Sequence, residues 1–480
     1  MSILVVDVGT SGLRAAMVTP DGIVEHVHHK VLLPDTPMPS FVQFDAEAMA
    51  AAILEVASAA IEEGGEPTAV GIANQRASTI VWERSTGAPV GPGVGWQDLR
   101  TVGMCLGLQQ QGLRVAPNQS ATKLAFLLDM ADPDRVRDLC FGTVDTWVAW
   151  VLSGGSAHVT DASNAAITGL MTLDGAGWDR TILEHLRIPE AVLPEIVDST
   201  GVVGHASALP GSPPIAGIAG DQQASLVGQC CVRPGHAKIT FGTGGMLDLC
   251  LGETRPSFPT RGAGGAIPIV AWREAGRITW GVEAVMLSAG TAVEWLRDDL
   301  GILSSSAESE AVAAAAASTS DVFFVPALLG LGTPAWDFGA RGTFVGITRG
   351  TGRAEMVRAV LEGVAHRGAD LVEAAETDGG LRIDSVRVDG GMSANGVFVQ
   401  ALADATQRRV EVSPETEATT LGAAYLAGVA TGTWGSLDEL DARWHPKAIV
   451  EPRGPSQRDR WRAAVDRAGK WIPELSGLDF

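Results

Sequence analysis

Two polar Gly-Thr turns, one in each half of the chain, constrain the fold more than any other feature. The first, residues 9–12 (Gly-Thr-Ser-Gly), follows the apolar run 3–8, and the second, residues 242–245 (Gly-Thr-Gly-Gly), follows the run 237–241. A further apolar run comes directly after each turn. Short glycine-containing turns between apolar runs are typical of antiparallel strands. The recurrence predicts two related domains that face one another.

The remaining pattern alternates between strands and helices, which indicates an α/β protein with a mixed sheet. Asp45 is placed to cap the first helix. We expect strands at 13–18, 23–27, 69–73, 79–82, 246–251, 386–389 and 409–412, and helices at 45–61, 224–229, 393–407 and 420–430. The domain boundary is expected near residue 228, which gives domains 1–228 and 229–480.

Length and charge restrict the function. At 480 residues the chain can form two or three domains. Its net charge of −21 excludes a non-specific binder of nucleic acid or of anionic membranes, since both need a basic surface. No apolar run is long enough to span a bilayer, and the first residues do not form a signal peptide. Five cysteines without metal-ligand spacing fit a reducing compartment, so we expect a cytoplasmic protein.

The turns carry the chemistry of phosphate binding. Successive turn amides can hold an anion, Thr10 and Ser11 add hydroxyl donors, and Arg14 adds a fixed cation. Asp7, at the end of the first strand, could hold Mg²⁺ through water. An ordinary hairpin turn is the alternative for either turn alone. Two such turns, with Thr243 in the second, predict a clamp for a polyphosphate and thus phosphoryl transfer.

Two other junctions bear polar or glycine residues at strand ends. Asp221 follows a predicted strand and could act as a general base, or as the cap of the helix 224–229. Gly390-Gly391 leaves room for a ribose or a flat ring at the start of a helix, or forms a tight turn. Trp96, within the polar stretch 95–100, is the aromatic candidate beside these motifs. A core position and a wall of the binding site both remain open for it.

In this order, the motifs resemble the FGGY carbohydrate kinases, and within that family the glycerol kinases. The resemblance runs nearly end to end and is most specific in three stretches: GTVDTWVAWVLSGG (142–155), IAGDQQA (218–224) and GLGTPAWDFGARGTFVGITRG (330–350). It implies an actin-like ATPase fold, with two ribonuclease-H-like domains around a central cleft that holds ATP and Mg²⁺. Members of the family form dimers and tetramers, so a homo-oligomer is one expectation.

The resemblance also implies roles for individual residues. Asp221 would be the general base and, with Asp7, would help to place the metal ion. The first domain would supply most of the polyol site. The implied polyol-binding residues are Arg76, Trp96, Asp221 and Gln222, and the implied nucleotide-binding residues are Thr10, Ser11, Arg14, Thr243, Gly290, Gly391 and Asn395.

The sequence departs from glycerol kinases at four positions of the expected site. Ala77 stands where they have Glu, Asn118 where they have Tyr, Met246 where they have an aromatic residue, and Glu294 where they have Gln. Loss of the Glu removes a charge-assisted hydrogen bond of roughly 1.5–3 kcal/mol. These changes imply a roomier pocket that is less specific for a three-carbon triol.

The expected activity is therefore ATP-dependent phosphorylation of a primary hydroxyl of glycerol or a closely related small polyol. A longer polyol or a ketose as substrate, such as a tetritol, a pentitol or a xylulose-like sugar, is the first alternative. A catalytically weak regulatory paralogue and a non-catalytic ATP-responsive module are the others.

Overall fold

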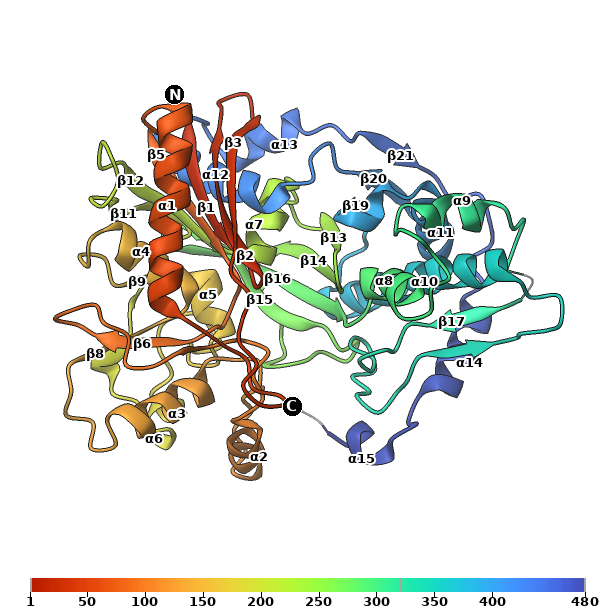
Figure 1. Cartoon of the computed structure of the whole chain (residues 1–480), viewed down its shortest axis with the longest axis horizontal. Coiled ribbons are helices and arrows are strands. Elements are labelled where there is room, and N and C mark those ends of the chain that lie inside the picture. Colours follow the sequence, from red (N-terminus) through yellow and green to blue (C-terminus); the bar gives the residue numbers. More distant parts are fainter. Residues whose placement is uncertain (1, 320, 479–480) are drawn as a thin grey trace.

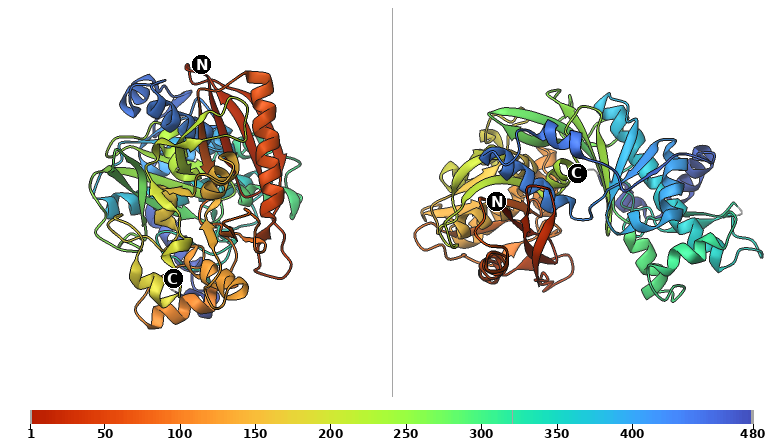
Figure 2. Two further views of the ribbon diagram at one scale, coloured as in Figure 1. Left: turned by 90° about the vertical axis from the view of Figure 1, so that its left-hand side faces the viewer. Right: turned by 90° about the horizontal axis from the view of Figure 1, so that it is seen from above.

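One large mixed sheet runs through both halves of the molecule, which lie side by side (Figures 1 and 2). The computed structural model describes residues 2–319 and 321–478. Within these residues the sheet has thirteen strands, in the order β21 (Ala448–Val450), β20 (Arg409–Val412), β19 (Ser385–Asp389), β13 (Ala237–Phe241), β14 (Gly245–Gly252), β16 (Arg277–Met286), β15 (Ile267–Glu274), β11 (Thr200–His205), β12 (Pro214–Gly220), β5 (Ala69–Asn74), β1 (Ile3–Val8), β2 (Gly12–Val18) and β3 (Val24–Val31).

The two halves of this sheet repeat one pairing pattern. In the first half, β1 is antiparallel to β2 and parallel to β5, and β5 is parallel to β12. In the second half, β13 is antiparallel to β14 and parallel to β19, and β19 is parallel to β20. Each predicted Gly-Thr turn joins the first two strands of its half. This repeat confirms the expected fold of two similar α/β halves.

The side chains of the central strands point alternately to the two faces of the sheet, and this explains how the layers form. On β1, Leu4 and Val6 pack in the same core as helix α1 (Ala46–Gly64), whereas Ile3 and Val5 pack with α12 (Ala418–Thr431). Successive strand residues face opposite sides of a sheet, so a strand with apolar residues at consecutive positions is covered on both faces. Asp45 caps α1 as predicted, because its Oδ1 accepts from the backbone N–H groups of residues 47 and 48.

Helix α12 belongs to the second half of the sequence but lies over the first half of the sheet, against α7 (Asp221–Gly228) (Figure 1). The two helices cross closely at Gly228 and Gly422. A Cβ on either glycine would collide with the backbone of the opposite helix. Gly71 of β5 meets the backbone of Ala423 in the same way. These glycines allow one segment to join the two halves beside the predicted site.

The other elements cover the sheet and extend both halves. The remaining strands form two-stranded pairs: β4 (Gln43–Phe44) with β7 (Gly93–Val94), β6 (Ile80–Glu83) with β8 (Leu139–Gly142), β9 (Val159–Asp161) with β10 (Glu195–Val197), and β17 (Phe323–Val325) with β18 (Thr343–Val345). The remaining helices are α2 (Val102–Gln110), α3 (Ala121–Ala131), α4 (Val144–Leu152), α5 (Ala162–Ile167), α6 (Arg180–His185), α8 (Gly290–Asp298), α9 (Glu308–Ala314), α10 (Arg353–Gly379), α11 (Gly396–Thr406), α13 (Leu437–Arg443), α14 (Arg458–Ala468) and α15 (Pro473–Ser476), with 3-10 turns at Glu190–Val192 and Gly391–Ala394.

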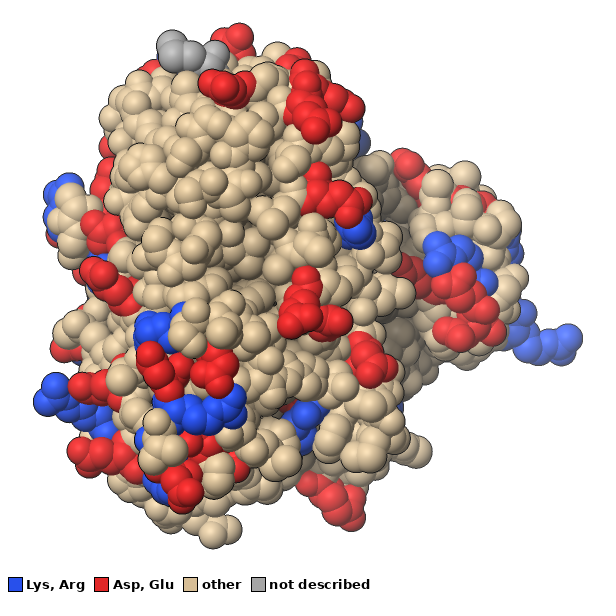
Figure 3. Space-filling view, turned by 60° about the vertical axis from the view of Figure 1, so that its left-hand side comes forward, with Lys and Arg blue, Asp and Glu red and all other residues tan. Residues whose placement is uncertain are grey.

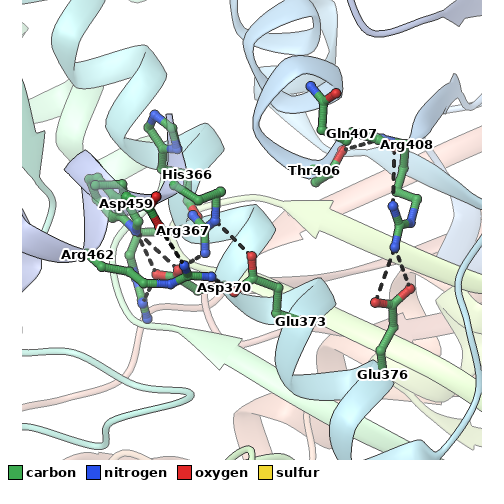
Figure 4. A network of polar contacts seen from close by, with 12 residues as sticks. His366, Arg367, Asp370, Glu373, Glu376, Thr406, Gln407, Arg408, Asp459 and Arg462 are labelled. Atoms are coloured by element: carbon green, nitrogen blue, oxygen red, sulfur yellow. Dashed lines mark hydrogen bonds and ion pairs between the residues drawn. The ribbon is translucent and has the colours of Figure 1, made fainter. Parts of the chain in front are cut away.

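Two polar clusters fasten the long helix α10 to its neighbours (Figure 4). Asp370 accepts from Arg367, from Arg458 and from the indole N–H of Trp461, which ties α14 to α10. Further along α10, the Glu376 carboxylate pairs with Arg408 at 3.1 Å. Both clusters stabilise the second half, and neither contains a residue predicted for the site.

Several predicted boundaries differ from the structure. The strand predicted at 23–27 extends to Val31, because it pairs with the full length of β2. The helix predicted over 393–407 is a 3-10 turn over 391–394 followed by α11 from Gly396, since Asn395 begins α11 as its N-cap. The helix predicted from residue 224 starts at Asp221 itself, and its N-cap is Gly220, so Asp221 does not cap it.

The surface agrees with the charge of the sequence. On the face shown in Figure 3, acidic and basic side chains are intermixed, and no broad basic surface is present. Among the helices of the described residues, none is both long and apolar enough to cross a bilayer. The five cysteines are free thiols, and all are buried.

Candidate active site

The first Gly-Thr turn is closed by a backbone hydrogen bond from Gly9 N–H to Gly12 O, at 2.9 Å. Asp7 and Arg14 lie opposite each other in the hairpin, and Arg14 Nε donates to Asp7 Oδ2 at 3.0 Å. The guanidinium of Arg14 also pairs with Glu417, the residue before α12. About a third of the Arg14 side chain is exposed, so this predicted phosphate ligand is held by two carboxylates at the surface of the site.

The second turn lies beside two other predicted nucleotide residues. Gly290 N–H donates to Gly242 O at 2.9 Å, and a Cβ on Gly290 would approach that oxygen to 2.6 Å. Gly390 is left-handed (φ 83°) and packs on the backbone of Phe241, just before the turn. By contrast, a Cβ built on Gly242 or Gly391 would meet nothing within 4 Å. The structure thus gathers the second turn, Gly290 and Gly391, and leaves the backbone open on one side.

Two further residues predicted to bind the nucleotide lie on α8 and at the start of α11. Glu294 is exposed and lies on α8, one helical turn beyond Gly290. Asn395 has structural partners: its Oδ1 accepts from Phe398 N–H at 3.0 Å, and its Nδ2 donates to Ser309 Oγ at 3.1 Å.

Asp221 meets the predicted polyol residue Arg76 at the start of α7. Arg76 Nε lies 3.3 Å from Asp221 Oδ1, and Arg76 Nη1 lies 2.8 Å from Glu283 Oε2 on β16. The Asp221 carboxylate is 33% exposed, whereas Arg76 and Glu283 are only 12% and 7% exposed. The cluster therefore presents a single carboxylate, Asp221, outward and keeps its supporting charges inside.

The surroundings of Asp221 shift its affinity for protons. Desolvation raises the pKa of Asp221 above its usual range; Arg76 opposes this, while Asp7 and Glu283 add to it. Desolvation likewise raises the pKa of Asp7, against the effect of Arg14. A carboxylate with a raised pKa binds a proton more readily, which suits a general base.

Gln222, the next residue, contacts a buried lysine. Lys238 Nζ donates to Gln222 Oε1 at 2.7 Å and lies 2.8 Å from Asp248 Oδ2. Lys238 and Asp248 are both fully buried, on β13 and β14. Desolvation raises the pKa of Asp248 to about 7, while the charge of Lys238 opposes the shift.

Trp96 connects the predicted polyol residues to the first turn. Its indole N–H donates to Thr10 Oγ1 at 3.2 Å, and its backbone N–H donates to Ser78 Oγ at 3.1 Å. From behind, the buried Lys123 of α3 donates to Trp96 O at 3.0 Å. Because an indole N–H can only donate, the Thr10 oxygen must accept, and the Thr10 hydroxyl proton remains available for another acceptor.

The three departures expected around the polyol lie in different environments. Ala77 is buried and left-handed (φ 61°), and its carbonyl accepts from Ser120 Oγ at 2.9 Å. Asn118 is exposed, two residues before Ser120. Met246 is half-buried on β14, on the same strand face as Asp248. The link through Ser120 brings the segments of Ala77 and Asn118 together.

A magnesium ion fits the donors present. In residues 2–319 and 321–478, no cluster of three or more His, Cys, Asp or Glu side chains could hold a metal ion. Asp7 and Asp221 nevertheless lie close enough for the charge of Asp7 to raise the pKa of Asp221. Mg²⁺ is usually bound by one or two carboxylates together with water and substrate phosphates, so two such carboxylates agree with this preference.

Sequence reasoning missed four charged residues that shape the site: Lys238, Asp248, Glu283 and Glu417. A signal was present for the first two, because each is a lone charge inside an apolar run predicted to be a buried strand. Such a charge needs a buried partner. Glu417 carried no comparable signal, because its partner Arg14 is 403 positions earlier in the sequence.

Paired Gly-Thr hairpins in two halves of the same topology, with the partly exposed carboxylate of Asp221, are features of a phosphotransferase with an actin-like ATPase fold. Sequence comparison then identifies the family: residues 2–228 match the N-terminal domain of the FGGY family of carbohydrate kinases, and 237–431 match its C-terminal domain. The chain belongs to this family.

Individual relatives and solved structures agree with this family assignment. The chain is 41% identical to a glycerol kinase of Aromatoleum aromaticum, over 98% of this chain and 99% of that protein, and 42% identical to one of Trichlorobacter lovleyi, over 98% and 99%. The crystal structure of Plasmodium falciparum glycerol kinase with ADP superposes with a TM-score of 0.90 at 27% identity, over 97% of this chain and 98% of that one. A xylulose kinase from Lactobacillus acidophilus shares the fold (TM-score 0.85, 20% identity, 99% and 98% covered).

Proposed function

We propose that this chain transfers the γ-phosphoryl group of ATP to a primary hydroxyl of glycerol or a closely related small polyol. The observation that carries the proposal is the outward carboxylate of Asp221, held by the inward Arg76–Glu283 pair between two Gly-Thr hairpins. Full-length identity of about 41% to glycerol kinases supports the substrate class. The proposed division of the chain is 1–228, mainly for the polyol, and 229–480, mainly for the nucleotide.

In the proposed reaction Asp221 accepts the proton of the attacking hydroxyl, while Arg76 holds the carboxylate in place through its Nε, at 3.3 Å. Trp96 would form a wall of the polyol site, and Gln222 would bind one of the polyol oxygens. Thr10, Ser11, Arg14 and Thr243 would bind the phosphates. Asp7 and Asp221 would hold Mg²⁺, which neutralises phosphate charge when bound.

Arg14 must change partners for this role. In the structure it contacts Asp7 and Glu417. A triphosphate carries more negative charge than either carboxylate and accepts bidentate hydrogen bonds from a guanidinium, so it can compete for Arg14. Since the chain has a net charge of −21, local donors of this kind have to hold the nucleotide against the overall field.

A longer polyol or a ketose is the second candidate, and Ala77 favours it. The residue leaves no carboxylate at a point where glycerol kinases, as the family resemblance implies, have one. A single missing hydrogen bond to a substrate hydroxyl weakens selectivity for that substrate.

The experiment is an assay of polyol-dependent ADP release with glycerol, erythritol, threitol, ribitol, xylitol, dihydroxyacetone and ketoses. We expect turnover that requires a divalent cation and is fastest with glycerol or a near relative. No stimulation of ADP release by any of these compounds, in folded protein, would refute the proposal.

A further inference from the structure

A fully buried ion pair lies behind Gln222, and the proposed reaction does not use it. Lys238 and Asp248 are directly opposite in the β13–β14 pairing, with side chains 0% exposed and 2.8 Å between Nζ and Oδ2. Burying two charges costs free energy even when they are paired, and apolar side chains of similar size often serve stability equally well. Packing alone therefore does not explain why this pair is present.

The contacts of Lys238 define that role. Its ammonium group reaches three oxygens: Asp248 Oδ2 at 2.8 Å, Gln222 Oε1 at 2.7 Å and Thr240 Oγ1 at 3.0 Å. An ammonium group has three N–H donors and no acceptor. Since Lys238 can only donate, the atom of Gln222 that faces it must be the amide oxygen rather than the nitrogen.

Gln222 is thereby oriented. With its oxygen held by Lys238, its Nε2 donors point away from the buried pair. Gln222 is half-buried and follows Asp221 directly in the chain. A side-chain amide held in this way can offer its two N–H donors to a substrate.

The pair is also part of a layer of charges across three strands. Asp248 lies opposite Glu283 in the β14–β16 pairing, and Glu283 binds the Arg76 that holds Asp221. Gln222 and Asp221 therefore rest on one continuous buried layer, which fixes their positions relative to each other.

We propose that Lys238 and Asp248 are positioning residues that fix Gln222 as a hydrogen-bond donor to an oxygen atom of the polyol. The inference rests on the proposed function, because it places Gln222 in the polyol site. It selects substrates that offer an acceptor oxygen, either hydroxyl or carbonyl, to Gln222.

The test measures glycerol binding by isothermal titration calorimetry with a non-hydrolysable ATP analogue present, so that no turnover is needed. The double variant K238M/D248L replaces the pair by apolar side chains and avoids an unpaired buried charge. We expect its glycerol Kd to rise about tenfold, the loss of one well-placed hydrogen bond, while its Kd for the ATP analogue stays within about twofold.

A second variant does not depend on how the double variant folds. Q222E keeps an oxygen for Lys238 but has no N–H donor, so its glycerol Kd should rise by a similar factor. The matched control is R408M, which breaks the Arg408–Glu376 pair in the same half but outside the site (Figure 4) and should leave the glycerol Kd unchanged.

The outcomes separate the two hypotheses. If the wild type binds glycerol and either Q222E or a folded K238M/D248L binds it equally well, the positioning role is wrong and the proposed function stands. If the wild type binds neither glycerol nor any other polyol of the panel, the proposed function is wrong, and so is this inference.

Discussion

The two Gly-Thr hairpins have the same topology, but their cross-strand ion pairs lie at different depths. In the β1–β2 hairpin the pair is Asp7–Arg14, the second residue pair from the turn, and a third of Arg14 is exposed. In the β13–β14 hairpin the pair is Lys238–Asp248, the fourth from the turn, with both side chains fully buried. The first hairpin thus leaves one charge of its pair, Arg14, partly exposed, whereas the second hairpin buries both charges.

This difference separates two uses of an ion pair. Arg14, of which a third is exposed, can exchange partners at a lower cost than a buried cation, because water screens its guanidinium group. A buried pair cannot be broken without leaving an unpaired charge in the interior, so it can only hold other groups in place. We therefore expect Arg14 to act on ligands, and Lys238 to act on the fold and on Gln222.

The largest effect is expected at Asp221, whose pKa is raised by the charges of Asp7 in the first half and Glu283 in the second. D221N should lower kcat roughly 10²- to 10⁴-fold, since the amide cannot accept the hydroxyl proton. The Kd for ATP, measured by titration calorimetry, should change little. Undiminished turnover would show that Asp221 is not the general base.

Breaking the buried pair alone should cost stability. K238M leaves Asp248 unpaired in the interior, and we expect the free energy of unfolding, from urea denaturation, to fall by about 3–5 kcal/mol. The matched variant R14M removes a side chain of which a third is already exposed, so it should lose less free energy of unfolding than K238M. Equal losses in the two variants would remove the distinction between the hairpins.

The same R14M variant should instead affect ATP. A hydrogen bond to a charged group contributes about 1.5–3 kcal/mol, so kcat/KM for ATP should fall roughly 10- to 100-fold. The KM for glycerol should change much less. An unchanged kcat/KM for ATP would mean that Arg14 stays bound to Asp7 and Glu417 during the reaction.

The pH dependence follows from the raised pKa of Asp221. The base must be ionised, so kcat/KM should fall about tenfold for each pH unit below that pKa. Desolvation, Asp7 and Glu283 raise the pKa and Arg76 lowers it, with a net increase. The acidic limb of the pH–rate profile should therefore lie above 3.8, the ordinary value for Asp. A limb at or below that value would contradict the assignment.

The smallest effect is expected for the hydrogen bond that joins the polyol wall to the first hairpin. W96F keeps an aromatic ring but loses the N–H that donates to Thr10. We expect the KM for ATP to rise a few-fold, in line with about 0.5–1.5 kcal/mol for one hydrogen bond. In a T10V background the same substitution should have no further effect on ATP; additive losses would contradict coupling through Thr10.

Much of the fold could be predicted because it rests on local signals. Three features follow from the spacing of apolar residues and from the residue types at caps and turns. They are the strand at residues 3–8, the cap at Asp45 and the end of α12 at Gly432, which is left-handed (φ 79°). The alternative that Asp221 caps a helix is wrong, because Asp221 is the first residue of α7 and Gly220 is its N-cap; cap and first-turn positions favour the same residue types.

The site could be predicted only in part, because its charges are paired over long sequence distances. Glu283 meets Arg76, and Glu417 meets Arg14, only after the halves have come together. No local pattern encodes such contacts. Lys238 and Asp248 are the exception in principle, since isolated charges within two buried strands that form one hairpin indicate a buried pair.

The most direct measurement is ³¹P NMR of a reaction that contains the protein, ATP, Mg²⁺ and glycerol. The account predicts equal amounts of ADP and of a phosphate monoester on a primary carbon of glycerol, and neither product when glycerol is left out. Release of inorganic phosphate without formation of a phosphate ester would contradict it.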